Sequence, residues 1–257
     1  RSTDLFPPPV PPPPLSGRGR IPPPPTLLYG DTQSHGPDPL RVAIQQDRVL
    51  APWQHGPVSE DHYFTAAPAS AEQRRSLRVH LAARDVEVEV AGGVFSPGGL
   101  DKGTAILLDE VPQPPAEGTF LDLGCGWGPM ALTMGLLSPD AEVWAVDVNE
   151  RALDLTRANA ARLGLDRIVA VQPDDVPDEA TFDLIWSNPP IRIGKPALHE
   201  LLRTWLPRLA DGGTAYLVVS KNLGGDSLQR WIESDLGLRC MRYASSKGFR
   251  ILAVTHP

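Results

Sequence analysis

The sequence has little cysteine and no long apolar run. Its two cysteines, Cys125 and Cys240, lie far apart and show neither a disulfide framework nor the spacing of metal ligands. We therefore expect a reduced, cytoplasmic setting and no bound metal. Every apolar run is too short to span a membrane, and the start of the sequence lacks the sustained apolar region of a secretory signal, so no membrane partner is expected.

Positive charge is also scarce. The 24 Lys and Arg residues against 31 Asp and Glu residues give a formal charge of −7. This balance counts against a simple electrostatic grip on nucleic acid, for which basic domains are usual. Two runs are locally basic. A solvated face is an equal alternative for the arginines of segment 74–84, whereas Arg192 and Lys195 favour a substrate role because they closely follow Asn188.

Residues 1–40 differ in composition from the rest of the chain. They hold nearly half of the 29 prolines, in runs that favour polyproline II and cannot build a core. We expect a disordered tail that is dispensable, or upstream sequence translated beyond the true start. An SH3-type ligand and a spacer are the alternatives.

The segment Phe120–Pro129 (FLDLGCGWGP) changes abruptly from an apolar run to three alternate glycines. It predicts a buried strand, a tight loop whose backbone N–H groups face a ligand, and a helix with Pro129 in its first turn. The dinucleotide fingerprint does not fit, because the third glycine comes one residue early. A phosphate loop needs a Lys after the glycines, and none follows. The remaining pattern, D-x-G-x-G-x-G from Asp122, resembles motif I of class I S-adenosylmethionine (SAM) methyltransferases.

Two further apolar runs end in polar residues. Glu142–Asp147 ends in an acid 20 to 25 residues beyond the first glycine, where Rossmann-like sites place a ribose-binding carboxylate. The alternative for Asp147 is a helix N-cap, for which Asn149 competes.

The third run ends in Asn188-Pro189-Pro190. Proline donates no backbone hydrogen bond, so the Asn188 side-chain oxygen and the Pro189 carbonyl become fixed acceptors that can hold the two hydrogens of an amino group. Such acceptors stabilise the positive charge that grows on nitrogen during methyl transfer. An ordinary turn after a strand is the alternative interpretation.

With their surroundings, these three segments resemble the small-domain family of class I methyltransferases, which includes the 16S ribosomal RNA guanine-N2 methyltransferases. The resemblance runs from about residue 61 to the end and includes GVFSPGGLDKGTAILL, VDVNERALDLTRANA and SNPPIRIGK. It implies SAM as cofactor, ribosomal RNA or the small ribosomal subunit as partner, and a monomer or homodimer. Amino-methyltransferases more often carry a base-stacking aromatic where this chain has Ile191.

The resemblance also implies roles for single residues. Asp174, with Asp175 as an almost equal candidate, lies where the family contacts the adenine amino group. The catalytic candidates are Asn188, Pro189 and Pro190. The cofactor candidates are Asp122, Gly124, Cys125, Gly126, Gly128, Asp147, Val148, Asp174, Asp175 and Asn188. The substrate candidates are Phe95, Lys102, Ile191, Arg192 and Lys195. For Asp101 and Thr104, lining the active-site mouth and merely capping a helix are about equally supported.

The alternation of strand and helix patterns predicts an α/β, Rossmann-like fold with a mostly parallel seven-stranded sheet and helices on both faces. A small N-terminal hairpin is expected, with a strand at Val86–Val90 turning at Gly92 and Gly93 into Val94 and Phe95. We divide the chain into a tail, residues 1–40, and a methyltransferase domain, residues 41–257. That domain comprises an N-terminal extension, 41–110, and a SAM-binding core, 111–257.

Three other functions remain open. The Asn-Pro-Pro chemistry also suits methylation of a protein glutamine amide, although those enzymes typically have an aromatic where Ile191 stands. A non-catalytic RNA-binding module would have no need for all the motif residues. A small-molecule methyltransferase predicts an enclosing lid, which the short N-terminal segment does not indicate.

Overall fold

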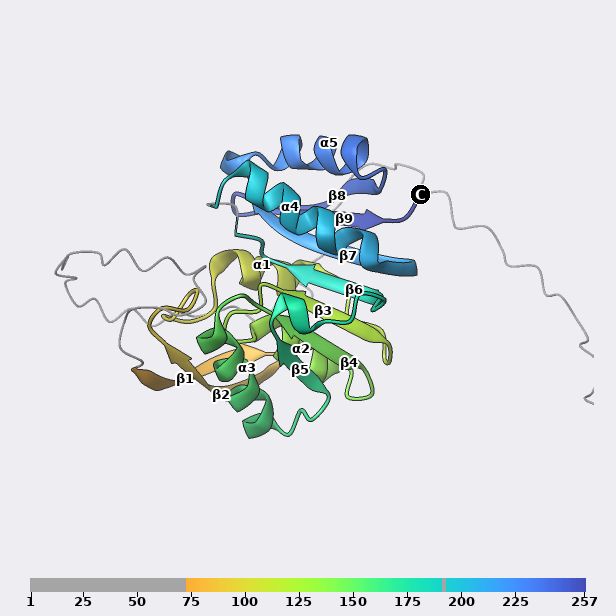
Figure 1. Cartoon of the computed structure of the whole chain (residues 1–257). Coiled ribbons are helices and arrows are strands. Elements are labelled where there is room, and N and C mark those ends of the chain that lie inside the picture. The colour runs from red at the N-terminus through yellow and green to blue at the C-terminus, as the bar shows by residue number, and fades with distance from the viewer. Residues whose placement is uncertain (1–72, 191–192) are drawn as a thin grey trace, which may run out of the picture. The chain divides into compact units, whose positions relative to one another are not determined.

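The computed structural model describes residues 73–190 and 193–257 (Figure 1). The proline-rich tail, Ile191 and Arg192 lie outside the described residues. The strands are β1 Arg74–Leu81, β2 Arg84–Ala91, β3 Thr119–Leu123, β4 Glu142–Val146, β5 Ile168–Val171, β6 Phe182–Ser187, β7 Leu209–Ser220, β8 Arg239–Ser246 and β9 Phe249–Thr255. The helices are α1 Lys102–Glu110, α2 Pro129–Leu137, α3 Glu150–Leu163, α4 Lys195–Trp205 and α5 Gly225–Asp235, with short 3-10 turns η1 Pro173–Asp175, η3 Leu206–Arg208 and η4 Lys221–Leu223.

Seven strands form the main sheet in the order β5-β4-β3-β6-β7-β9-β8. The pairs from β5 to β7 are parallel, and β9 runs antiparallel to both β7 and β8. The predicted mostly parallel, seven-stranded α/β fold is therefore confirmed. From β3 the chain proceeds through β4 to β5 toward one side of the sheet, and from β6 it proceeds through β7 toward the other side. The carboxyl ends of β3 and β6 thus flank a topological switch point, where α/β sheets bind ligands.

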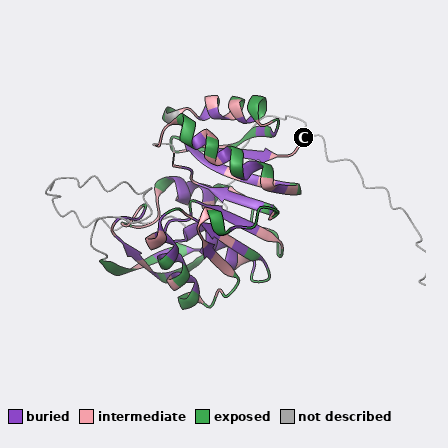
Figure 2. Cartoon of the chain, in the orientation of Figure 1, coloured by how far each residue is buried: buried purple, intermediate pink, exposed green. Residues whose placement is uncertain are grey.

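Side chains that alternate along the strands build a core on each face of the sheet. Phe120 packs with residues of α1 and α2, whereas Leu121 and Leu123 pack with residues of α4 and α5. The central strands are accordingly buried between the helices (Figure 2). This two-sided burial explains why β3 and β6 are nearly continuous apolar runs.

No helix in the described ranges is long and apolar enough to cross a membrane.

The N-terminal hairpin differs from the expectation. The strand around Val86–Val90 does not turn back at Gly92 and Gly93; β2 instead pairs with the preceding strand, β1, through a two-residue turn at Ala82 and Ala83. Both alanines have positive φ, 49° and 58°. A two-residue hairpin turn of this kind normally uses Asn-Gly, so the sequence carries no turn signal there. The hairpin packs on α3, where Arg162 bonds to Glu87 and Glu89.

The strand β7 contains a pair of glycines. Gly212 and Gly213 lie inside the strand, because β7 begins at Leu209. A Cβ on Gly213 would lie 2.8 Å from the carbonyl oxygen of Phe182, and the β6–β7 register shifts at this point. Glycine here therefore permits a close backbone approach at a bulge rather than ending an element.

The hairpin turn yields a stability prediction. Ala82→Asn with Ala83→Gly should raise the free energy of unfolding by about 1 kcal/mol, because an alanine at positive φ costs roughly 1–2 kcal/mol that Asn and Gly largely avoid. Denaturant unfolding measures the change. Ala161→Gly, in the last turns of α3, makes a similar chemical change at helical φ and should lower stability instead. If the turn variant were no more stable than wild type, the conclusion that Ala82 and Ala83 are strained at positive φ would be wrong.

Candidate active site

Three strands of the sheet end side by side at the switch point. Leu123, the last residue of β3, is in register with Val146 at the end of β4 and with Ser187 at the end of β6. The residues that follow these ends are therefore neighbours in space although they are far apart in sequence. These are the glycine loop, Asp147 and Asn188.

The glycine loop has positive φ at all three glycines: 79° at Gly124, 58° at Gly126 and 93° at Gly128. A Cβ on Gly124 would meet nothing within 4 Å, so this position faces open space. A Cβ on Gly128 would instead lie 2.9 Å from Oγ1 of Thr156, so this glycine lets α2 approach α3. The first glycine thus leaves room for a ligand, and the third serves packing.

The expected ligand-facing N–H groups are mostly engaged within the protein. The N–H groups of Gly124 and Cys125 both donate to the Val146 carbonyl, at 2.8 and 3.1 Å. The Gly126 N–H donates to Asp147 Oδ2 at 3.0 Å, and the Gly128 N–H to the Cys125 carbonyl at 2.9 Å. The expectation is therefore wrong for these four groups. The loop offers a ligand space and carboxylates rather than a row of donors.

Asp147 joins the glycine loop to the start of α3. Besides the bond from Gly126, its Oδ1 accepts the N–H of Asn149 at 2.9 Å. The N-cap of α3 is Asn149, whose side chain accepts the N–H of Arg151. Asn149, and not Asp147, is therefore the N-cap of α3. Its two oxygens retain further lone pairs for a ligand at the end of β4.

The side chain of Asn188 is held in one orientation. Its Nδ2 donates to Asp101 Oδ2 at 2.8 Å and to Thr104 Oγ1 at 3.1 Å, so both amide hydrogens are used. Among the described residues, no donor bonds to its Oδ1 or to the Pro189 carbonyl. Asp101 also caps α1 through the N–H groups of Gly103 and Thr104. The helix cap therefore fixes the amide so that its oxygen remains available as an acceptor.

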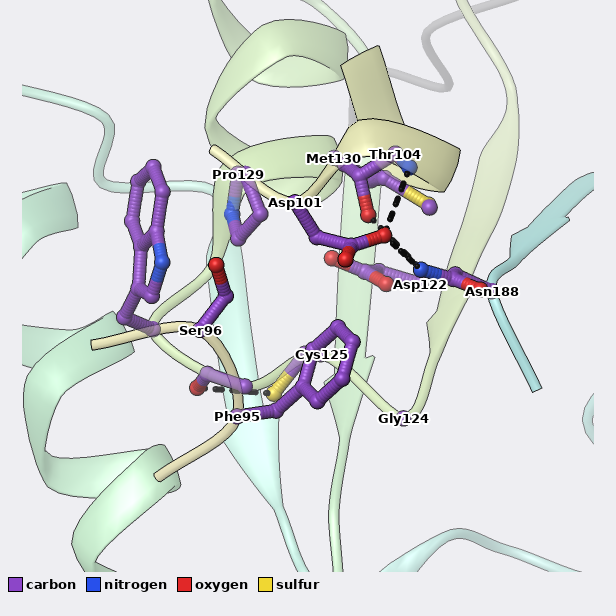
Figure 3. Close-up of a pocket in the computed structure, with 12 residues that line it drawn as sticks. Phe95, Ser96, Asp101, Thr104, Asp122, Gly124, Cys125, Pro129, Met130 and Asn188 are labelled. Carbon is purple, nitrogen blue, oxygen red and sulfur yellow. Dashed lines mark hydrogen bonds between the residues drawn. The ribbon is translucent and has the colours of Figure 1, made fainter. Parts of the chain in front are cut away.

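The glycine loop and Asn188 line one pocket, whereas Asp147, which bonds to Gly126, is not part of its lining (Figure 3). From the predicted site residues it gathers Phe95, Asp122, Gly124, Cys125, Gly126 and Asn188. It also includes residues for which sequence reasoning predicted no role or only a secondary one: Ser96, Asp101, Thr104, Trp127, Pro129 and Met130. The Phe95 side chain is 43% exposed, which is unusual for a large apolar residue and leaves an aromatic ring at the pocket.

Other predicted residues lie along the same edge of the sheet but do not line this pocket. Val148 is exposed beside Asp147, and both Asp174 and Asp175 are exposed in η1 after β5. Their placement beyond β4 and β5 extends the edge away from Asn188. The remaining candidates do not line this pocket either and lie in loops or at helix starts: Gly128, Pro189, Pro190, Lys102 and Lys195. In the described ranges, no cluster of His, Cys, Asp and Glu suits a metal ion.

Comparison with known proteins places this geometry in a family. The family model described as methyltransferase small domain matches residues 85–253, which is more than half of the chain. The chain belongs to the methyltransferase small domain family. The matched range includes the glycine loop, Asp147 and Asn188, and it begins inside the hairpin.

Individual relatives agree with this assignment. The chain is 32% identical over 170 residues to the uncharacterized protein YbxB of Bacillus subtilis, covering 65% of this chain and 85% of that one. It is 35% identical over 209 residues to ribosomal RNA small subunit methyltransferase C of Pseudomonas entomophila, covering 79% of this chain but 60% of the relative. This chain therefore spans less than two thirds of that relative.

A solved structure matches the fold. The 16S rRNA N2 methyltransferase of T. thermophilus, in complex with AdoMet and guanosine, superimposes with a TM-score of 0.63 at 22% identity. The match covers 72% of this chain and 51% of that one. At this identity the likeness shows a shared fold.

Burial shapes the electrostatics of this methyltransferase domain at the switch point. Burial raises the pKa of Asp122 to about 7, against the hydrogen bond from the Ala131 N–H and with help from the charge of Asp147. Burial also raises the pKa of Asp147, against hydrogen bonds from Asn149 and Gly126. Two carboxyl groups with weakened acidity thus lie near the glycine loop, where a cationic ligand would stabilise their charged forms.

Cys125 is not a nucleophile in this site. It is 3% exposed, and burial raises the pKa of its thiol well above the ordinary value. Its Sγ lies 3.6 Å from Thr156 Oγ1, on the side of α3. The thiol is therefore inert at neutral pH and serves packing.

The pKa of Asp122 predicts a change in the pH dependence of stability. Between pH 3.8 and about 7 the folded chain holds a proton on Asp122 that the unfolded chain has lost, so this group makes stability fall as the pH rises. Asp122→Asn keeps an acceptor for Ala131 and removes the titration. Denaturant unfolding should find the variant more stable than wild type at pH 8, by up to about 4 kcal/mol at roughly 1.4 kcal/mol per pH unit, and similar to wild type at pH 4.

The control for this experiment is Asp183→Asn. Asp183 also accepts a backbone N–H, that of Thr119, but it is exposed on β6. An Asp122→Asn difference that did not grow with pH, or that merely matched the control, would contradict a buried carboxyl with a raised pKa.

Proposed function

We propose that this chain is a SAM-dependent N-methyltransferase acting on an exocyclic amino group, guanine N2 of small-subunit ribosomal RNA. The observation that carries the proposal is the fixed amide of Asn188. Because Asp101 and Thr104 take both amide hydrogens, Oδ1 is left as the available acceptor of a side chain that lines the pocket. An acceptor fixed in this way suits a nitrogen that carries hydrogens and gains positive charge.

The residues present suit SAM as the methyl donor. The open space at Gly124 admits a ligand against the backbone, and Asp122 has no cationic side chain of the described residues as an ion-pair partner. The ammonium group of SAM would satisfy that carboxylate, and Asp147 would accept the ribose hydroxyls. When bound, SAM supplies an electrophilic methyl group on a sulfonium.

The chain's own contribution is to hold the acceptor nitrogen. The amine of guanine is a poor nucleophile because its lone pair is delocalised into the ring. Two carbonyl acceptors, Asn188 Oδ1 and the Pro189 carbonyl, would hold its two hydrogens, favour a pyramidal nitrogen and stabilise the growing charge. Alignment of the nitrogen adds a proximity contribution, and no general base is required.

Asp101 strengthens this acceptor. Its carboxylate accepts an Asn188 amide hydrogen at 2.8 Å, which draws electron density toward Asn188 Oδ1, since linked hydrogen bonds polarise one another. Only the Asn188 side chain would separate the negative charge of Asp101 from the nitrogen that becomes cationic. Asp101 is therefore a positioning residue in this mechanism, acting through Asn188.

The relatives support ribosomal RNA as the substrate. The relative of Pseudomonas entomophila is named for the small-subunit RNA, and the T. thermophilus structure contains AdoMet and guanosine. An exposed Phe95 at the pocket offers a ring against which a base can stack, a role that the absence of an aromatic at Ile191 leaves open.

Transfer of labelled methyl groups from SAM tests the function. Small ribosomal subunits, free ribosomal RNA and cytosolic protein are incubated separately with enzyme, and the labelled product is digested and identified by mass spectrometry. We expect N2-methylguanosine from subunits or free RNA. Methylglutamine in the protein fraction would replace the proposal with the glutamine alternative, and SAM binding without any labelled pool would contradict both.

Turnover of variants tests the mechanism. Asn188→Ala should lower kcat by roughly 100-fold, the cost of losing one such contact, while the Kd for SAM stays within about two-fold. Asp101→Ser retains a good N-cap for α1 but is too short to reach Asn188, so it should lower kcat by roughly 10-fold without loss of thermal stability. Kinetics at saturating SAM and a calorimetric Tm measure both effects.

Asp101→Asn is the matched control. Its side-chain oxygen can still cap α1 and accept the Asn188 hydrogen, so its kcat should lie between those of wild type and Asp101→Ser. Full turnover by Asp101→Ser would mean that Asp101 only caps the helix.

A further inference from the structure

Lysine is rare in this chain, and the lysines lie at one edge of the main sheet. Only four of the 24 basic residues are lysines, and all four lie in the described ranges. Lys102 begins α1, Lys195 begins α4, Lys221 follows β7, and Lys247 lies in the turn between β8 and β9. Each of these positions is a loop or helix start at the carboxyl edge of the parallel strands. All four side chains are exposed.

Three of the lysines converge on Phe249. Ser220, which precedes Lys221, and Ser246, which precedes Lys247, both pair with Phe249 in the sheet. The Lys221 N–H also donates to the carbonyl of Gly248 at 3.0 Å. The Nζ of Lys102 lies 6.0 Å from the centroid of the Phe249 ring.

This cluster adjoins the fixed amide. A Cβ built on Gly103 would lie 3.2 Å from the Phe249 ring and 3.3 Å from Asn188 Nδ2. Phe249 and Asn188 are therefore separated by little more than one methyl group. The fourth lysine, Lys195, shares a small surface pocket with Val219 and Gly224, which flank the 3-10 turn that Lys221 begins.

The charges of these lysines are not neutralised locally. No lysine forms an ion pair with a carboxylate of the described residues, whereas arginines elsewhere do, including Arg74, Arg157, Arg162, Arg203, Arg242 and Arg250. Among nearby acids, Asp226 pairs with Arg242 and Arg250, and Asp101 is occupied by the α1 cap and Asn188. Four lysines without a carboxylate partner among the described residues thus lie along this edge in a protein of net charge −7.

We propose that these four residues, the lysine rim, bind the phosphate backbone of the RNA strand whose guanine enters the pocket; this rests on the proposed function. Exposed ammonium groups are compact point charges that suit phosphates approached from several directions. The rim lies beside the amide that would hold the base, so the flanking phosphates fall within its reach. A segregated rim also explains how an acidic protein attracts a polyanion.

The test compares two double variants that each remove two positive charges. Lys221→Gln with Lys247→Gln weakens the rim and leaves the residues around Asn188 intact. Arg167→Gln with Arg239→Gln is the control, because both arginines are exposed at the opposite edge of the sheet, where Arg167 precedes β5 and Arg239 begins β8. The probe is free small-subunit ribosomal RNA, and its Kd is measured at several salt concentrations for both variants and wild type.

Loss of two phosphate contacts should reduce the slope of log K against log salt by about 1.5 and weaken binding roughly ten-fold near 100 mM salt. The control should keep the wild-type slope, and the Kd for SAM should be unchanged in both variants. Suppose that the rim variant bound RNA with the wild-type slope while wild type formed N2-methylguanosine. The proposal that the lysine rim binds phosphates would then be wrong, and the proposed function would remain supported. If wild type formed no methylated RNA but the rim variant lost RNA binding, the proposed function would be wrong and the phosphate-binding role of the rim would remain supported.

Discussion

The site depends on two carboxyl groups, the buried Asp122 and the half-buried Asp147, that fasten the glycine loop to the sheet. Asp122, which is 1% exposed, accepts the N–H of Ala131 at 2.8 Å and so fixes the first turn of α2. Asp147 accepts the N–H of Gly126 and fixes the other side of the loop to the end of β4. Burying these carboxyl groups is costly, which is why the pKa of each is raised. Asp122 has no cationic side chain of the described residues as an ion-pair partner, which agrees with a cationic ligand.

A second feature of the site is that one carboxylate, that of Asp101, has two roles. Asp101 begins α1 and holds the Asn188 amide, so a helix that packs on β7 and β9 also sets the orientation of the side chain that follows β6. Packing of α1 is thereby coupled to the acceptor geometry. Gly103 allows this close packing, because a Cβ there would lie only 3.2 Å from the Phe249 ring and 3.3 Å from Asn188 Nδ2.

Much of the fold was predictable because its signals are local. The strand Ile168–Val171 and the helix Glu150–Leu163 follow from apolar patterns, caps and glycines that act within a few residues. The hairpin turn was not predictable, since Ala82 and Ala83 adopt positive φ under the demand of pairing β1 with β2. The extension of β7 through Gly212 and Gly213 likewise reflects contact with β6, which no local pattern encodes.

From the sequence alone it follows that an acid-and-glycine loop, a second acid and an Asn-Pro-Pro segment each follow a buried strand, because side-chain alternation and proline chemistry are properties of the local chain. It took the folded chain to show that the loop N–H groups bond inward, that Asp101 and Thr104 orient Asn188, and that the lysines gather at one edge. The Asn188 contacts join residues separated by more than 80 positions, and strand order in the sheet brings them together.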